Sequence, residues 1–312
     1  MYRYTLSLDG ESVGIQSETD LSTVLTKWKE LLHLTGVEAR LGGEHEFVVE
    51  YTNAPNNEVS YSEKHARITM PFTKLRTGEL LLYAAFPFLE VLHQRKMIVT
   101  MHAAAIEFSG KAVLLLGKAG AGKTSLALSL CRNYGARLIG NDIVKIGLAN
   151  GNINTYAGSK YFFLRQESIK RNIPSLLHLF PKSKRDAWTN KIYCLPEKLG
   201  IDTYVGYAPI AQSYLVHVDE TMKYLYVNSA DRIDTKLYLN ENMSRYIRGT
   251  AIALFSEESH FMGYVPSYDT PAFFTMRVKL IETLISNIGI VYLAGSLNDI
   301  CQHLVSEKES QR

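Results

Sequence analysis

Residues 117–124 have the side-chain types and spacing that bind a polyphosphate. They read Gly-Lys-Ala-Gly-Ala-Gly-Lys-Thr, which fits the phosphate-loop pattern G-x-x-x-x-G-K-[ST]. In such a loop, glycines let backbone N–H groups close around the phosphates, the Lys reaches the β- and γ-phosphates, and the Thr hydroxyl binds Mg²⁺. The candidate nucleotide-binding residues are Gly117, Ala119, Gly120, Ala121, Gly122, Lys123, Thr124 and Ser125.

The segments on either side of this loop show whether the pattern has its expected setting. Residues 112–116 form a short apolar run that is typical of a buried strand. Residues 125–131 place apolar side chains at helical spacing, and Gly135 stands where a helix is expected to end. The alternative is a Gly/Ala-rich turn that binds nothing. The order strand, loop, helix favours the phosphate loop.

A phosphate loop also needs a carboxylate that helps to hold Mg²⁺, usually at the end of a neighbouring strand. Asp142 lies 18 residues after Thr124, following a helix and a short strand over residues 137–139. We therefore take Thr124 and Asp142 as candidate metal ligands. The alternative for Asp142 is a turn-forming role, because Gly140-Asn141-Asp142 is a good turn sequence.

The elements that position these residues divide the chain into two expected domains. Residues 1–97 read as an α+β region that begins with a hairpin around Asp9-Gly10. Helices are expected over residues 21–34 and 77–96, and Pro87 should kink or interrupt the second. Residues 98–312 read as an α/β nucleotide-binding domain that ends in a strand at 290–293 and a helix over 297–305, with frayed residues after 305.

Composition narrows the classes of partner. Of the 312 residues, 46% are hydrophobic and 21% are charged, which is typical of a globular protein. The net charge of +3 gives no reason to expect nucleic acid or a membrane as a partner. No signal peptide and no run of 18 apolar residues is seen, and three widely spaced cysteines do not form a disulfide framework. We expect a cytoplasmic protein; homo-oligomerisation stays open.

One segment is far more basic than the rest. Residues 160–191 contain eight Lys or Arg against Glu167 and Asp186, a net charge of +6. Arg165 and Arg171 are candidates to supply charge to a transferring phosphoryl group, because Arg binds phosphate through parallel donors. The segment could equally hold an acidic peptide, close as a lid, or be a solvated surface loop. The basic residues are Lys160, Arg165, Lys170, Arg171, Lys182, Lys184, Arg185 and Lys191.

The stretch from His102 to Ile146 resembles a known family. His102-Ala103-Ala104-Ala105 leads into the strand and phosphate loop, and Leu138-Ile139-Gly140-Asn141-Asp142 closes the unit. This resembles the catalytic domain of HPr kinase/phosphorylase and related kinases of peptide-natural-product pathways. The resemblance implies a P-loop-containing mixed α/β sheet of the HPr kinase and phosphoenolpyruvate carboxykinase type, with ATP and Mg²⁺ as cofactors.

The same resemblance implies roles for individual residues. Lys123 would neutralise charge on the β- and γ-phosphates, and Asp142 matches the second acid of the family's Asp-Asp pair, which binds metal. His102 matches a histidine of the active-site region; its alternative is a hydrogen-bonded histidine at a strand start. Arg165 lies in a looser match, Leu164-Arg165, and completes the candidate catalytic residues.

Asn141 departs from the family, which has Asp there as general base. Asn cannot accept a proton, which leaves three alternatives. The protein is a degenerate kinase, or it uses another base such as His102 or Glu167. The third alternative is that no strong base is needed, because the transition state of phosphoryl transfer is loose. A lost base costs roughly 10²–10⁴-fold. The expected function is a kinase acting on a hydroxyl of a peptide, protein or small molecule. The alternatives are a nucleotide-binding regulator or scaffold and, less favoured, a mechanochemical ATPase. We further expect the N-terminal region to recognise the acceptor, or a leader peptide if the protein is a pathway enzyme.

Overall fold

The computed structural model describes residues 1–25, 38–75, 78–181, 186, 190–249, 253–256 and 260–310. The chain divides into two compact units, Met1–Thr100 with Asn240–Lys279, and Met101–Leu239 with Leu280–Arg312. The sequence pattern places residues 240–279 with the nucleotide-binding domain, whereas in the structure they cluster with the first hundred residues. The boundary therefore does not fall at a single point in the chain.

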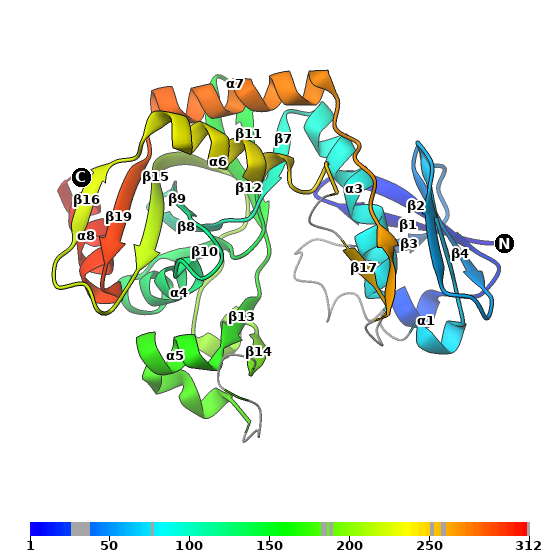
Figure 1. Cartoon of the computed structure of the whole chain (residues 1–312), viewed down its shortest axis with the longest axis horizontal. Coiled ribbons are helices and arrows are strands. Elements are labelled where there is room, and N and C mark those ends of the chain that lie inside the picture. The colour runs from blue at the N-terminus through cyan, green and yellow to red at the C-terminus, as the bar shows by residue number, and fades with distance from the viewer. Residues whose placement is uncertain are drawn as a thin grey trace. The chain divides into compact units, whose positions relative to one another are not determined.

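The first unit is built on a six-stranded mixed sheet with the order β3-β1-β2-β4-β6-β5. Strands β2, β4 and β6 run parallel to one another, and the other pairs are antiparallel. The elements of this unit are β1 (Tyr2–Leu8), β2 (Glu11–Ser17), α1 (Ser22–Leu25), β3 (Glu38–Leu41), β4 (Val48–Asn53), β5 (Glu58–Tyr61), β6 (His65–Met70), the 3₁₀ turn η1 (Phe72–Lys74), α3 (Glu79–Arg95), β17 (Ala253–Phe255) and β18 (Phe261–Tyr264), several of them labelled in Figure 1.

The hairpin predicted around Asp9-Gly10 is confirmed. Leu8 pairs directly with Glu11, so the turn has two residues, and both have positive φ, 51° at Asp9 and 84° at Gly10. These angles match a type I′ turn, whose twist suits the right-handed twist of paired strands. The expected helix over 21–34 is described only for α1; residues 26–37 lie outside the described part of the chain.

Helix α3 is not interrupted at Pro87, one of the two outcomes expected there. The helix runs without interruption from Glu79 to Arg95 with Pro87 inside it. An internal proline costs about 3 kcal/mol, because it removes a hydrogen bond and clashes with the preceding turn. Phe88 and Leu89 are fully buried, and Phe88 stacks on Phe47 of the same unit at 4.9 Å. This burial offsets the cost and keeps the helix continuous.

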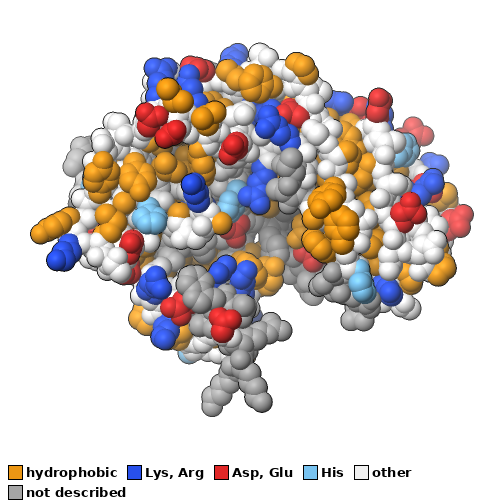
Figure 2. Space-filling model, in the orientation of Figure 1, with side chains coloured by type: hydrophobic (Ala, Val, Ile, Leu, Met, Phe, Trp, Pro, Cys, Tyr) orange, Lys and Arg blue, Asp and Glu red, His pale blue; other side chains and the backbone are white. Residues whose placement is uncertain are grey.

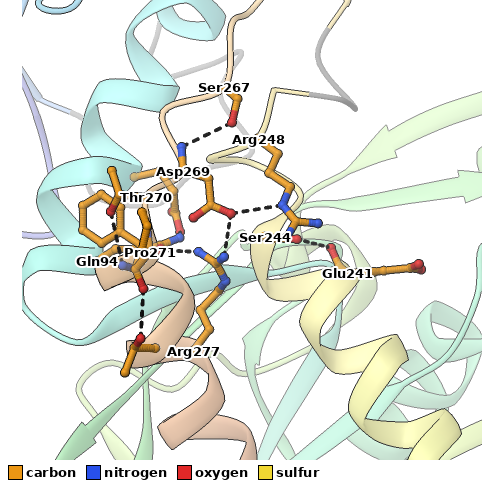
Figure 3. A network of polar contacts seen from close by, with 12 residues as sticks. Gln94, Glu241, Ser244, Arg248, Ser267, Asp269, Thr270, Pro271 and Arg277 are labelled. Atoms are coloured by element: carbon orange, nitrogen blue, oxygen red, sulfur yellow. Dashed lines mark hydrogen bonds and ion pairs between the residues drawn. The ribbon is translucent and has the colours of Figure 1, made fainter.

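A buried polar network explains why residues 240–279 belong to the first unit. Arg277 is completely buried and donates to Gln94 Oε1 of α3 at 3.0 Å and to Asp269 Oδ2 at 2.7 Å. Arg248 Nε donates to the same oxygen of Asp269 at 3.0 Å (Figure 3). Burial raises the pKa of Asp269, but the hydrogen bonds from Arg277 and Arg248 outweigh it and hold that pKa below its usual range.

The second unit contains the larger mixed sheet. Its strands follow the order β10-β8-β9-β15-β12-β11, with β19 beside β15 and β16 beside β19. The strands are β8 (Ala104–Phe108), β9 (Lys111–Leu116), β10 (Arg137–Gly140), β11 (Val144–Ala149), β12 (Asn152–Gly158), β15 (Ala208–Val218), β16 (Tyr226–Ser229) and β19 (Val291–Gly295); β7 (Ile98–Met101) spans the boundary between the units.

Helices and the two-stranded ribbon formed by residues 162–165 and 191–194 pack on this sheet. They share one hydrophobic core with strands β8, β9, β15 and β19. The elements are α4 (Lys123–Tyr134), β13 (Phe162–Arg165), α5 (Gln166–Asn172), η2 (Pro174–Leu179), β14 (Lys191–Cys194), η3 (Pro196–Leu199) and α8 (Leu297–Ser310). Helices α6 (Arg232–Ser244) and α7 (Pro271–Asn287) have residues in both units. Helix α8 continues to Ser310, so the fraying expected after residue 305 is wrong for residues 306–310.

The three cysteines are buried as free thiols. Burial raises the pKa of Cys131 to about 12 and that of Cys301 to about 11. Both therefore behave as apolar core residues and not as nucleophiles. Among the described residues, no helix is long and apolar enough to cross a membrane.

Candidate functional site

The candidate residues gather because several strand ends meet at one edge of the sheet of the second unit. Strand β8 is antiparallel to both β9 and β10, so β9 and β10 run in the same direction. Strand β15 is parallel to β9. The loop after β9, the Asn141-Asp142 pair after β10, His102 just before β8 and Asp219 just after β15 therefore all stand at this edge.

The loop that follows β9 has the backbone shape that its glycines predict. Gly117, Gly120 and Gly122 all have positive φ, at 149°, 84° and 89°. A Cβ on Gly122 would lie 2.4 Å from the side chain of Val218, whereas a Cβ on Gly120 would meet nothing within 4 Å. Gly122 thus lets β15 approach the loop, and Gly120 leaves its outer side open to a ligand. The predicted order of strand, loop and helix is confirmed, with Gly135 as the C-cap of α4.

Lys123 is the first residue of α4 and its side chain folds over the loop. Its Nζ donates to the carbonyl oxygens of Gly117 at 2.8 Å and Lys118 at 3.1 Å, and only 6% of the residue is exposed. The ammonium group is therefore held above the loop by the loop's own backbone. Thr124 is half-buried beside it. Ser125 accepts a hydrogen bond from Asn172 Nδ2 of α5 at 3.0 Å, which ties α5 to the phosphate-loop helix.

Tyr238 of α6 contacts the loop at its first residue. The Tyr238 hydroxyl accepts a hydrogen bond from Gly117 N–H at 2.9 Å and donates one to Gly117 O at 3.0 Å. No motif pointed to this residue, because 121 positions separate it from Gly117 in the sequence. Only the placement of α6 brings the two together.

The structure places His102 next to Asp142. His102 Nε2 is 3.8 Å from Asp142 Oδ1, and the Asp142 side chain is 44% exposed. Asp142 has a φ of 66°, which Asp tolerates better than most residues and which turns the chain out of β10. An open carboxylate on a turn at a strand end is suited to bind a cation or to orient the neighbouring imidazole.

Asn141 is fully buried and its amide orientation is determined by its surroundings. Its Nδ2 donates to Asp142 Oδ2 at 3.3 Å and to the carbonyl of Tyr161 at 3.2 Å. Turning the amide over would place its oxygen against these two acceptors. The amide thus positions the Asp142 carboxylate. Its own Oδ1 is buried with no hydrogen-bond partner, so it remains as an acceptor inside the site.

Two glycines let β10 and β12, which are not adjacent in the sheet order, approach each other closely at this point. A Cβ on Gly140 would lie 2.6 Å from the Cα of Gly158, and a Cβ on Gly158 would lie 2.6 Å from the Cα of Gly140. Ser159 then holds the turn, because Asn141 N–H donates to its carbonyl at 2.8 Å. Lys160 Nζ donates to backbone carbonyls, at 3.1 Å to Leu138 and at 2.9 Å to Tyr204. Lys160 therefore has a structural role at the end of β10.

The structure separates the roles of the basic segment. Arg165 is the N-cap residue of α5 and pairs with Lys191 across the β13–β14 ribbon. Arg171 forms an ion pair with Glu167 at 3.6 Å. Lys182, Lys184 and Arg185 lie outside the described residues.

Asp219 is a further acid at the sheet edge that the sequence motifs did not indicate. Hydrogen bonds from the backbone N–H and the hydroxyl of Thr221, assisted by the charges of His217 and Arg171, hold its pKa below the usual range. It directly follows β15, the strand that lies beside the phosphate-loop strand and parallel to it. A carboxylate in this place, ionised at neutral pH, adds a negative group to this edge of the sheet.

The residues present have the chemistry to hold a phosphate group together with Mg²⁺. The loop backbone is open at Gly120, and Thr124 and Asp142 are the hydroxyl and carboxylate oxygens that Mg²⁺ prefers. Within the described part of the chain, no three of His, Cys, Asp and Glu gather into a metal cage. Mg²⁺ in nucleotide sites needs none, since it is held by one or two protein oxygens, water and the phosphates.

Comparison with solved structures finds a likeness to the Hpr(Ser) kinase/phosphatase from Coxiella burnetii. The sequence identity is 15%, the TM-score is 0.33, and the match covers 68% of this chain and 95% of that chain. No protein-family model and no curated protein matches the sequence. The mixed α/β architecture rests on the strands and helices described above, and the more specific HPr-kinase type stays a prediction.

Proposed function

We propose that the protein is an ATP- and Mg²⁺-dependent kinase that transfers the γ-phosphoryl group to a hydroxyl of a peptide, protein or small-molecule acceptor. One observation carries the proposal: the loop of residues 117–124 joins β9 to α4 at the sheet edge where His102 and Asp142 lie 3.8 Å apart. A phosphate-binding loop without a neighbouring acid and base would support binding alone. The loop would bind the phosphoryl donor, and the His102–Asp142 pair would mark the place of the acceptor hydroxyl.

Each residue has a role that follows from its position. The loop N–H groups and Lys123 would bind the phosphates, and Thr124 and Asp142 would hold Mg²⁺, which supplies positive charge to the transferring group when bound. His102 is a better candidate base than Glu167, because it lies beside Asp142 at the same edge of the sheet as the loop. Glu167 is already paired with Arg171. Arg165 stays a candidate for phosphoryl charge stabilisation.

The direct test is transfer of label from γ-labelled ATP to a panel of Ser- and Tyr-containing peptides and small polyols. The Lys123→Ala variant should lose transfer by at least about 10²-fold, because phosphate charge is no longer neutralised. Lys111→Ala is the matched control, since Lys111 is exposed at the opposite end of β9. Equal transfer by the wild-type protein and Lys123→Ala would refute the proposal.

The second candidate function is a nucleotide-binding regulator that does not transfer phosphate. The observation that favours it is the Asn141 amide, which is neutral and locked between Asp142 and Tyr161. Binding of ATP that depends on Lys123, with no acceptor labelled and no ADP released, would favour the regulator over the kinase.

The proposal includes the compartment of the protein and the classes of its partners. We place it in the cytoplasm, where its three buried thiols stay reduced. On the face seen in Figure 2, Lys and Arg side chains are interspersed with Asp and Glu. A mixed surface and a net charge of +3 support a nucleotide and a polypeptide or small molecule as partners, and not nucleic acid. Self-association is left to a direct measurement of mass in solution.

A further inference from the structure

Strand β16 forms one edge of the large sheet in the second unit. Among the described strands it pairs with β19 alone, and it lies at the border of the sheet beside β19 (Figure 1). All four of its residues, Tyr226–Ser229, are exposed. Edge strands are usually protected from pairing with another strand by charged side chains or proline, and β16 contains neither. Its sequence therefore permits a further strand to pair with it.

The hydrogen bonds to β19 show which backbone groups of β16 face outward. The antiparallel register continues past the strand to Ala230 and Ile290, and Ala230 N–H donates to Ile290 O at 3.0 Å. Hydrogen-bonded pairs alternate with non-hydrogen-bonded pairs along an antiparallel ladder. Ala230, Asn228 and Tyr226 therefore face β19. Val227, which lies between the last two, directs its N–H and C=O away from the sheet.

The next outward residue is already satisfied within the strand. By the same alternation Ser229 faces outward, and its N–H donates to Asn228 Oδ1 at 2.9 Å. Within the described residues no side chain caps Val227 in this way, and Val227 is 44% exposed. Val227 is therefore the position of β16 at which a new strand would form its hydrogen bonds.

A second copy of the same strand fits this edge. In an antiparallel pair about a two-fold axis at Val227, each Val227 N–H would donate to the other Val227 C=O. Tyr226 of one copy would stand opposite Asn228 of the other. Within one copy Asn228 Nδ2 donates to the Tyr226 hydroxyl at 3.0 Å, and this bond is kept when the copies pair. The two-fold closes the arrangement, so the edge is fully occupied by two copies.

The stretches on either side of β16 carry opposite charge. Residues 222–225, before the strand, contain Lys223 as their only charged residue. Residues 230–234, after it, contain two Asp and one Arg, a net charge of −1, and that Arg lies 4.0 Å from Glu282 of α7. Lys223 and Asp231 are both exposed. Asp231 also caps α6, which fixes its carboxylate at this end of the helix.

This distribution of charge favours a second copy over an unrelated strand. Antiparallel pairing of two identical strands brings the stretch before one strand beside the stretch after the other. The two-fold would then place Lys223 of each copy near Asp231 of the other, once at each end of the pair. An unrelated strand has no such matched pattern. Complementary charge of this kind selects the partner and its orientation more than it adds affinity.

We propose that β16 is the contact surface for a second copy of this chain, so that the two large sheets join edge to edge into one. The inference goes beyond the proposed kinase function and does not depend on it. A strand of four residues gives a small interface, of the weak class below about 1,200 Å². We therefore expect an equilibrium between monomer and dimer with a Kd on the order of 10 μM.

The test is the mass of the full chain in solution, measured by analytical ultracentrifugation at low salt from about 1 to about 300 μM, a range that spans this affinity. The wild-type mass should rise from the 35.2 kDa of one copy toward twice that value. Val227→Pro removes the outward N–H and should raise the Kd at least about 30-fold, and proline is tolerated where a strand N–H faces solvent. Val227→Thr is the matched control, because it keeps the N–H and favours a strand.

Lys223→Glu is a second variant, which decides the question if Val227→Pro does not fold by circular dichroism. It places like charges together at both ends of the strand pair, so it should weaken association about tenfold at low salt and less at high salt. Dimer formation by wild type and Val227→Thr that is weakened in both other variants supports the proposal.

Two results would overturn it. One is a wild-type protein that stays a single copy over the whole range, even if its edge pairs with a strand of another protein. The other is association of Val227→Pro and Lys223→Glu as strong as that of wild type, which would place the contact between copies on another surface.

Discussion

The hydroxyl of Tyr238 satisfies both backbone groups of Gly117, accepting from its N–H at 2.9 Å and donating to its carbonyl at 3.0 Å. Gly117 is buried and has a φ of 149°, so its peptide groups are turned away from the normal strand ladder. The Tyr238 side chain of α6 therefore supplies hydrogen-bond partners for Gly117 that a neighbouring strand would otherwise supply. The start of the loop of residues 117–124 is held by a residue 121 positions away in the sequence.

Removing this hydroxyl should loosen the loop. Tyr238→Phe leaves the Gly117 N–H without its partner, whereas the Gly117 carbonyl keeps Lys123 Nζ as a donor at 2.8 Å. An unsatisfied buried N–H costs about 1–3 kcal/mol. We expect a lower melting temperature and about three- to tenfold weaker binding of a fluorescent ATP analogue. Tyr224→Phe is the control, because Tyr224 is 81% exposed. Identical melting and binding in both variants would show that the contact with Gly117 contributes nothing.

Restoring an acid at position 141 should not restore a base. In Asn141→Asp, one carboxylate oxygen would face the Tyr161 carbonyl and the Asp142 carboxylate, the two acceptors that the amide now bridges. Burial would raise the pKa of the new carboxyl group in the folded protein above its value in the unfolded chain, which is about 4. The folded variant therefore loses stability as the pH rises above about 4, because the unfolded chain ionises first. At neutral pH we expect a loss of about 2–4 kcal/mol.

Thermal unfolding of Asn141→Asp across the range from acid to mildly alkaline pH measures this loss. Asn152→Asp, at an exposed position, controls for the added charge. Undiminished stability together with faster phosphate transfer would mean that the acid is tolerated and acts as the missing base.

The crossing of Gly140 and Gly158 should tolerate no side chain. A Cβ at either position would lie 2.6 Å from the Cα of the other, so β10 and β12 would have to separate. We expect Gly158→Ala to lose at least about 3 kcal/mol in urea unfolding. Gly120→Ala is the contrast, because its Cβ meets nothing and only the positive φ of 84° is strained, a cost of about 1 kcal/mol. Similar losses in the two variants would contradict the close crossing.

Asp269 should make the protein sensitive to acid. Its pKa is held below the unfolded value, so its contribution to stability is present above the unfolded pKa of about 4 and disappears as pH falls through the folded value. Asp269→Asn leaves the buried Arg277 charge without its carboxylate and should cost about 3 kcal/mol at neutral pH. The gap between wild type and variant should narrow on acidification.

Urea unfolding at neutral and acid pH checks this expectation, with Glu63→Gln as an exposed control in the same unit. A gap that stays constant with pH would show that ionisation of Asp269 does not contribute to the stability of the network.

Local patterns in the sequence were enough to predict much of the site. The glycines of residues 117–122, the apolar run of β9 and the helical spacing of α4 are contiguous, and local geometry alone joins them into a strand, loop and helix. The same holds for the Asp9-Gly10 hairpin, because a two-residue turn needs only its own φ angles. The motif selected His102 and Asp142 one by one, and their separation of 3.8 Å follows from the pairing of β8 with β10.

Other parts depended on contacts between distant segments, which no local pattern encodes. Tyr238 at Gly117, Asn172 at Ser125 and Asp219 beside the loop are placed by α6, α5 and β15, whose packing follows from burial of the whole core. Arg277 draws residues 240–279 into the first unit through Asp269 and Gln94. The sequence by itself therefore determined the strand, loop and helix and predicted which residues form a phosphate site. Only the tertiary structure decided which side chains support them, because each supporting contact joins parts of the chain that come together only when the core is complete.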